Sequence, residues 1–155
     1  MKFDPRTRRE FCAEACGAVG LAALGGALQA CGGGGLTGAS SVPALPSMSA
    51  SAGNGAVTLA IDASSPLASV GSAALVQSPS GLFLVARTGQ DSFTALTSIC
   101  THRVCTITNY ESRTYVCPCH GSRFDTSGRV TNGPAVRALR SYATRFSGDV
   151  LTITL

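Results

Sequence analysis

The sequence predicts an all-β protein. From residue 56 to the C-terminus, short runs rich in Val, Leu, Ile, Thr and Phe are separated by Gly, Pro, Ser and Asn. Several runs alternate apolar and polar residues, as the last six residues do, which is typical of a strand with one buried face. We find no amphipathic pattern longer than about two helical turns in this region. These observations favour a small antiparallel β-sandwich.

The strands are expected between recognisable turns. Ser78-Pro79-Ser80-Gly81 combines turn-forming residues between two apolar runs and predicts a hairpin. Ser147-Gly148-Asp149 predicts a second hairpin near the C-terminus. In chain order, the expected strands are residues 56–61, 73–77, 82–86, 93–98, 114–116, 135–140, 143–147 and 150–155.

Residues 1–30 predict an export signal. Arg8 and Arg9 precede Phe11 and a weakly apolar stretch over residues 15–30. A basic region before a short apolar region is typical of a secretory signal. The paired arginines resemble a twin-arginine signal, which exports proteins that have already folded. We therefore expect an exported protein on the periplasmic side.

Cys31 is a candidate lipidation site. Leu28-Gln29-Ala30 precedes it, and this segment resembles a lipoprotein processing site with an imperfect match at Gln29. The alternative is an uncut membrane anchor. The apolar stretch is shorter than the roughly 20 residues that span a bilayer, and its Gly and Ala partition weakly into lipid. We therefore favour membrane attachment through a lipidated Cys31.

Residues 31–55 are expected to form a flexible tether to a globular domain at residues 56–155. Four consecutive glycines open the segment, and Ser, Ala, Gly and Pro dominate the rest, so little of it can build a core. The formal net charge of +4 is modest, and no basic run with interleaved aromatics occurs. Nucleic-acid binding is therefore not expected.

Both histidines of the chain lie in cysteine-bearing segments. These segments are Cys100-Thr101-His102-Arg103-Val104-Cys105 and Cys117-Pro118-Cys119-His120-Gly121-Ser122. Two Cys and two His can hold a metal centre, and the other two Cys can close a disulfide. A zinc site would leave that extra pair without a role. A [2Fe–2S] cluster with Cys₂ on one iron and His₂ on the other explains all six residues.

The two segments resemble the C-T-H-x-G-C and C-P-C-H-G-S motifs of Rieske iron–sulfur proteins, with Val104 in place of the usual Gly. The similarity continues through Phe124-Asp125 and Gly133-Pro134-Ala135 and covers roughly residues 56–155. It implies a β-sandwich base with a small β cluster-binding subdomain, about residues 98–135. It also implies one [2Fe–2S] cluster bound by Cys100, His102, Cys117 and His120, and a disulfide between Cys105 and Cys119.

The resemblance also implies roles for residues around the cluster. Ser122 corresponds to a serine whose hydroxyl donates to a bridging sulfide, Gly121 is expected to present its N–H to sulfur, and Pro134 lies in a loop that covers the cluster. Phe124 stands where high-potential, quinol-oxidising members carry Tyr. Arg103 replaces a common Leu; its side chain can act on the cluster as a nearby cation or extend into water.

Such a centre predicts one-electron transfer. Two neutral imidazoles replace two anionic thiolates, so Rieske potentials lie at about −150 to +300 mV. Without Tyr at position 124, we expect a midpoint below that of quinol-oxidising members and above that of members lacking both hydroxyl groups. Oxidised iron acidifies bound imidazoles, so the midpoint should fall as the pH rises, and a flat midpoint from about pH 6 to 10 would count against His ligation.

The expected function is that of an exported, membrane-tethered redox protein or a small subunit of a respiratory oxidoreductase, bc-type or arsenite-oxidase-like. Its partners would be an electron donor and acceptor, such as a c-type cytochrome or a quinol-oxidising complex. A Rieske oxygenase needs a second iron site with two His and a carboxylate, and the chain has only two His. A ferredoxin that donates electrons to an oxygenase and a structural zinc module remain as alternatives.

Overall fold

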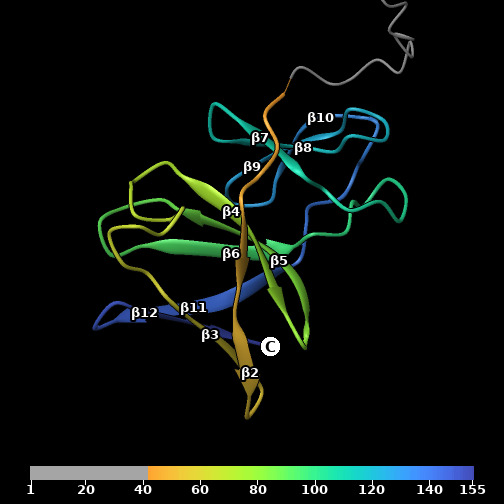
Figure 1. Cartoon of the computed structure of the whole chain (residues 1–155). Helices are drawn as coiled ribbons and strands as arrows, with labels where there is room; N and C mark the ends of the chain where they lie inside the picture. Colours follow the sequence, from red (N-terminus) through yellow and green to blue (C-terminus); the bar gives the residue numbers. More distant parts are fainter. Residues whose placement is uncertain (1–41) are drawn as a thin grey trace, which may run out of the picture. The chain divides into compact units, whose positions relative to one another are not determined.

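The computed structural model describes residues 42–155, which form twelve strands and no helix (Figure 1). This part of the chain accordingly contains no helix that could cross a membrane. The strands are β1 (Ser47–Ser49), β2 (Ser51–Gly53), β3 (Ala56–Ala60), β4 (Ala73–Ser78), β5 (Gly81–Arg87), β6 (Phe93–Thr97), β7 (Asn109–Glu111), β8 (Thr114–Val116), β9 (Arg123–Asp125), β10 (Val130–Asn132), β11 (Ser141–Ser147) and β12 (Val150–Thr154).

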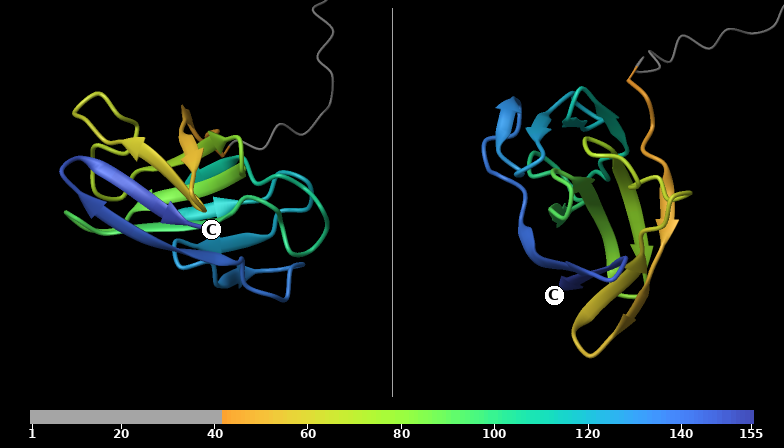
Figure 2. Two further views of the ribbon diagram at one scale, coloured as in Figure 1. Left: turned by 90° about the horizontal axis from the view of Figure 1, so that it is seen from below. Right: turned by 90° about the vertical axis from the view of Figure 1, so that its left-hand side faces the viewer.

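The strands form two sheets, which confirms the all-β prediction. The larger sheet has the order β1-β4-β5-β6-β11-β12-β3-β2, and only its β1–β4 pair is parallel. The smaller sheet has the order β10-β9-β8-β7 and is inserted between β6 and β11 in the sequence. It lies at the end of the domain away from the β2–β3 hairpin (Figures 1 and 2).

The central strands β4, β5 and β6 are buried on both faces. On β5, Phe83 and Val85 belong to a core shared with β3 and β12, whereas Leu84 and Ala86 face a second core shared with the smaller sheet. Successive side chains of a strand point to opposite faces. A strand between two cores therefore reads as a continuous apolar run, as Phe83-Leu84-Val85-Ala86 does.

Both predicted hairpins are confirmed. Ser78 pairs with Gly81 at the β4–β5 turn, where Gly81 has a φ of 126°. Ser147 pairs with Val150 at the β11–β12 turn, where Gly148 and Asp149 have φ of 55° and 62°. Two consecutive positive φ values are typical of a type I′ turn, whose twist matches that of the flanking strands.

The strand predicted at residues 135–140 is wrong. Ala135 and Leu139 are buried, but the residues between them are exposed, so burial does not alternate with a period of two. The backbone is fixed at separate points: the Ala135 N–H donates to Ser122 Oγ at 3.0 Å, and the Leu139 N–H donates to the Gly128 carbonyl at 2.9 Å. The segment is an anchored loop.

The predicted tether is wrong for residues 42–55. Strand β1 pairs with β4, and β2 pairs antiparallel with β3. Val42 and Leu45 are buried, and the Asn109 amide donates to the Val42 carbonyl at 2.7 Å. Small Ser and Ala residues can hold such edge strands through backbone hydrogen bonds, without large apolar side chains. Residues 31–41, Cys31, Arg8 and Arg9 lie outside the described residues.

Gly128 closes the turn between β9 and β10. In the same turn, burial would raise the pKa of Asp125, but hydrogen bonds from Ser127 and from the Arg129 N–H outweigh burial and hold this pKa below its ordinary value. Gly128 has a φ of 87°, and a Cβ there would lie 3.1 Å from both the Leu139 carbonyl and Leu96 Cδ2. The position therefore needs a glycine for its backbone conformation and for close packing.

Replacing Gly128 by Ala should destabilise the domain by roughly 2–5 kcal/mol, because left-handed strain adds to overpacking. Gly148→Ala is the matched control: its φ is 55°, and nothing lies within 4 Å of the new Cβ. We expect that control to cost only about 1–2 kcal/mol. Urea unfolding of both variants measures the difference, and equal losses would contradict the packing argument.

Candidate metal centre

Each cysteine-bearing segment folds as a tight loop. The first loop connects β6 to β7, and the Cys100 N–H donates to the Cys105 carbonyl at 2.9 Å. The second connects β8 to β9, and the Cys117 N–H donates to the Ser122 carbonyl at 2.9 Å. A disulfide joins Cys105 to Cys119 across the loops, which is the implied pairing. The two segments therefore lie side by side.

The four candidate ligands separate into a thiol pair and an imidazole pair. Cys100 and Cys117 are free and buried, with exposed fractions of 4% and 1%. Burial raises the pKa of the Cys117 thiol, and the adjacent Cys100 thiol raises it further. The rings of His102 and His120 lie 4.8 Å apart between centroids and are nearly perpendicular, at 89°. His102 is half-buried and His120 is exposed.

These residues fit a [2Fe–2S] cluster with two Cys and two His ligands. The Nδ1 atom of His102 is buried and has no hydrogen-bond partner in the described part of the protein. An orphaned buried nitrogen costs free energy unless it meets a partner, and a metal ion can accept its lone pair. The buried thiols can supply the second ligand pair, since metal binding replaces their protons. The donor set is that of a Rieske centre.

The disulfide also limits which sulfurs can bind metal. The Sγ atoms of Cys105, Cys117 and Cys119 lie within 4.8 Å of one another. Two of these sulfurs are bonded to each other, and a disulfide sulfur is not a thiolate ligand. Cys117 is therefore the candidate ligand that this group offers, and Cys100 is the other free thiol.

Ser122 is placed to donate a hydrogen bond into the site. It is fully buried, and its hydroxyl oxygen accepts the Ala135 N–H. Among residues 42–155, no acceptor takes the hydroxyl hydrogen, which leaves it free for a ligand. The same bond draws the Gly133-Pro134-Ala135 segment toward the second loop. Pro134 itself is exposed.

The role expected for the Gly121 N–H is wrong. This N–H donates to the Cys117 carbonyl at 3.0 Å and so closes the second loop. Gly121 has a φ of 74°, a conformation that side-chain-bearing residues rarely adopt. Its contribution is to the shape of the loop that carries Cys117 and His120.

Two aromatic residues fill the space beneath the loops. Phe124 on β9 pairs with Tyr115 on β8, and both are fully buried in the core that includes Cys100 and Cys117. The Tyr115 hydroxyl has no partner among the described residues, and burial raises its pKa well above the ordinary value. Phe124 carries no hydroxyl, so it cannot donate a hydrogen bond to sulfur.

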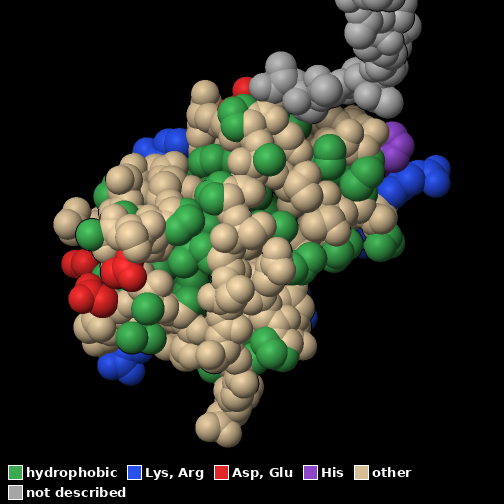
Figure 3. All heavy atoms as spheres, in the orientation of Figure 1, with side chains coloured by type: hydrophobic (Ala, Val, Ile, Leu, Met, Phe, Trp, Pro, Cys, Tyr) green, Lys and Arg blue, Asp and Glu red, His purple; other side chains and the backbone are tan. Residues whose placement is uncertain are grey.

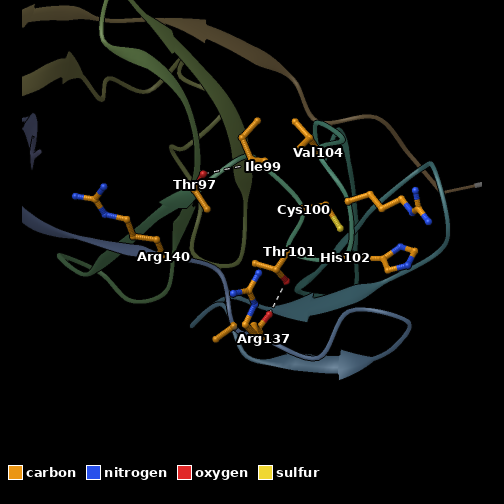
Figure 4. Close-up of a pocket in the computed structure, with 10 residues that line it drawn as sticks. Thr97, Ile99, Cys100, Thr101, His102, Val104, Arg137 and Arg140 are labelled. Carbon is orange, nitrogen blue, oxygen red and sulfur yellow. Dashed lines mark hydrogen bonds between the residues drawn. The ribbon is translucent and has the colours of Figure 1, made fainter.

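A further contact, which the sequence did not indicate, joins the first loop to residues 133–140. The Thr101 hydroxyl donates to the Arg137 carbonyl at 2.5 Å (Figure 4). Together with the bond between Ala135 and Ser122, it ties this segment to both loops. The Arg103 side chain is exposed, in agreement with the interpretation that it extends into water.

Comparison with known proteins identifies the family. The family model of the Rieske [2Fe-2S] domain matches residues 61–143. The cytochrome b6-f complex iron-sulfur subunit of Prochlorococcus marinus (strain NATL1A) is 40% identical over 75 residues, which are 45% of this chain and 42% of that protein. The corresponding subunit of Chlorobaculum thiosulfatiphilum is 33% identical over 64 residues, 41% of this chain and 35% of that protein. The chain thus spans less than half the length of these relatives.

Solved structures share the fold. The ferredoxin of carbazole 1,9a-dioxygenase from Nocardioides aromaticivorans IC177 superposes with a TM-score of 0.50 at 22% identity, covering 63% of this chain and 96% of that one. This likeness concerns the fold alone. Because the family model matches more than half of the chain and the two loops supply the Rieske ligand types, the chain belongs to the Rieske [2Fe-2S] domain family, whose cofactor is a [2Fe–2S] cluster.

Proposed function

We propose that this protein transfers single electrons between redox partners, with Cys100, His102, Cys117 and His120 as the cluster ligands. When bound, a [2Fe–2S] cluster accepts and releases one electron. The observation that carries the proposal is that the two loops present two buried free thiols and two imidazoles. The two imidazole ring centroids lie 4.8 Å apart, and the buried Nδ1 of His102 has no hydrogen-bond partner among the described residues.

The four candidate ligands differ in solvent exposure, which suits this role. The two cysteines are shielded from solvent, which keeps water away from metal–sulfur bonds, whereas His120 is exposed. A partner can therefore approach the imidazole side most closely. Ser122 can donate its free hydroxyl hydrogen to an anionic acceptor and so favours the reduced, more negative state.

The parent assembly is proposed from relatives. The cytochrome b6-f subunits indicate a Rieske subunit of a membrane-associated electron-transfer complex, with a cytochrome or a quinol-oxidising subunit as partner. Export through a signal containing Arg8 and Arg9, and attachment through Cys31, would place the domain on the periplasmic side. The disulfide supports an oxidising compartment. It also favours this assignment over a cytoplasmic ferredoxin that serves an oxygenase.

Purification with native metal tests the proposal. We expect a red-brown protein with about two irons and two sulfides per chain, a rhombic EPR signal after reduction, and a midpoint between about −150 and +300 mV. A colourless protein with stoichiometric zinc would instead support a structural zinc site. Iron without any reversible one-electron reduction would also overturn the proposal.

Phe124→Tyr should raise the midpoint potential. A phenol at this position could donate a hydrogen bond to a cluster ligand and stabilise the reduced state. A hydrogen bond to a charged group contributes about 1.5–3 kcal/mol. A tenfold change in the equilibrium constant of reduction corresponds to about 59 mV for one electron. The midpoint should therefore rise by no more than about 130 mV. Redox titration of both proteins measures it, with Tyr115→Phe as the variant that removes a neighbouring phenol. An unchanged or lower midpoint in Phe124→Tyr contradicts this account.

A further inference from the structure

A positively charged cleft adjoins the first loop. Its volume is about 520 Å³, and its walls include Ile99, His102, Arg103, Val104, Arg137 and Arg140 (Figure 4). One of the lining residues, His102, is therefore a candidate iron ligand. The other side is formed by the 133–140 segment, which the Thr101–Arg137 hydrogen bond holds against the loop.

The three arginines of this cleft carry uncompensated charge. All three side chains are exposed. Between residues 42 and 155, the one ion pair joins Arg123 to Glu111, and it does not involve them. The Arg140 guanidinium lies over the Tyr142 ring at 4.6 Å, which restricts its position without neutralising it.

Apolar side chains stand beside these charges. Val104 is 91% exposed and Val136 is 88% exposed, although both belong to loops that are otherwise anchored. Ile99 adds a third partly exposed apolar side chain. Arginine combined with exposed apolar residues is typical of protein–protein interfaces, where Lys and acidic residues are depleted.

Acidic residues gather at the far end of strand β11. Asp62, Asp91 and Asp149 line another hollow, of about 280 Å³, together with the single cation Arg87. Arg140 directly precedes β11 and Asp149 lies in the turn after it, so the seven residues of the strand, roughly 20–25 Å, and Gly148 separate them. Figure 3 shows red side chains grouped at one end of the domain, with blue side chains also at that end, and the visible histidine beside blue side chains at the other. Negative charge exceeds positive charge in this hollow, whereas no acidic residue lines the arginine cleft.

We infer that the arginine cleft docks an acidic surface surrounding the redox centre of a partner protein. The inference rests on the proposed function and specifies the partner. Charge polarity would orient an incoming acidic protein toward the imidazole end before contact. With a c-type cytochrome as acceptor, one electron leaves the reduced Rieske centre and ferric haem becomes ferrous. No bond forms or breaks, and no proton need move.

Binding of anionic lipid headgroups is the competing use of the same charges. A membrane seated on the cleft would cover the imidazole edge that a redox partner must reach. The observations therefore favour a protein, and the membrane becomes an outcome of the test.

The test uses stopped-flow oxidation of the reduced full chain by two c-type cytochromes of opposite surface charge, both with midpoints above that of this protein. Arg137→Glu removes a cleft charge and leaves the backbone carbonyl that accepts the Thr101 hydroxyl. Arg145→Glu makes the same change in net charge on exposed β11, and Arg137→Lys restores the charge. Midpoints of all variants are measured so that the driving force is known.

We expect the rate constant with the acidic cytochrome to fall at least about tenfold between low and high salt. At low salt, Arg137→Glu should lower it about three- to tenfold, while Arg145→Glu changes it less than about twofold and Arg137→Lys restores it. The inference is overturned if the basic cytochrome reacts as fast or faster, or if both Glu variants lose rate equally. It is also overturned if phosphatidylglycerol vesicles bind the wild type but not Arg137→Glu, with cytochrome rates unchanged.

A small oxidant separates the two proposals. Reduced protein that cannot reduce ferricyanide contradicts the electron-transfer function itself. Protein that reduces ferricyanide but responds to neither cytochrome charge nor Arg137→Glu contradicts only the docking inference.

Discussion

Single replacement of any candidate ligand is expected to yield protein without bound iron, whereas a variant that lacks the disulfide should still be isolated with iron. The ligand variants are Cys100→Ser, His102→Ala, Cys117→Ser and His120→Ala. The comparison variant is the double replacement Cys105→Ser/Cys119→Ser. All these changes lie within the same two loops, so a general loss of loop structure would affect both groups.

The expected difference follows from what each side chain offers. Cys100 and Cys117 are free thiols, and His102 Nδ1 has no protein partner among the described residues, so each can give a lone pair to iron. Cys105 and Cys119 are bonded to each other and have none of this capacity. Replacing both also avoids the unpaired thiol that a single replacement would leave beside Cys117, where it could compete for iron.

Iron and sulfide analysis, visible spectra and EPR of freshly purified proteins measure this outcome. Ligand variants should fall from about two irons per chain to near zero, because a cluster that loses one of its four protein ligands is no longer held. Iron retained by His102→Ala and His120→Ala would show that the histidines are not ligands. If the wild type contains zinc in place of iron, and the four ligand variants lose that zinc, the same residues form a zinc site.

Residue type and local spacing were enough to predict a metal centre and a disulfide in these two segments. The resemblance to Rieske proteins, not the spacing, assigned the pairing of Cys105 with Cys119, which the structure confirms. The ligand set that the same resemblance implies stays a prediction. The turns at Gly81 and Gly148 were equally local, since glycine accepts their positive φ values. Continuous apolar runs also located the doubly buried strands β4 and β5.

The missed elements depend on partners distant in the sequence. Strands β1 and β2 consist of small residues, and only their pairing with β4 and β3 identifies them as strands. The β7–β8 hairpin turns through Ser112 and Arg113, with φ of 46° and 61° but without the Gly or Asn typical of such a turn. The cleft likewise requires Arg103 and Arg137 to meet through folding.

Removal of the disulfide by Cys105→Ser/Cys119→Ser should lower the free energy of unfolding by about 2–4 kcal/mol. The bond joins residues separated by 14 positions, and closing a loop of this length restricts the unfolded chain by about 3 kcal/mol in the chain-entropy account. Urea unfolding of the iron-free wild type and double variant measures this term. The iron-free state is used because cluster loss makes unfolding of the loaded protein irreversible.

The same substitution should shorten the lifetime of the bound cluster. The disulfide is a direct covalent cross-link between the loop carrying Cys100 and His102 and the loop carrying Cys117 and His120. Without it, these loops are joined by hydrogen bonds through residues 133–140, such as those to Ser122 and from Thr101. Cluster absorbance on heating should therefore be lost at lower temperature. If the iron-free double variant is as stable as the iron-free wild type but the loaded variant loses its cluster faster, the disulfide acts on the metal site alone. Equal stability and equal cluster lifetime would refute both effects.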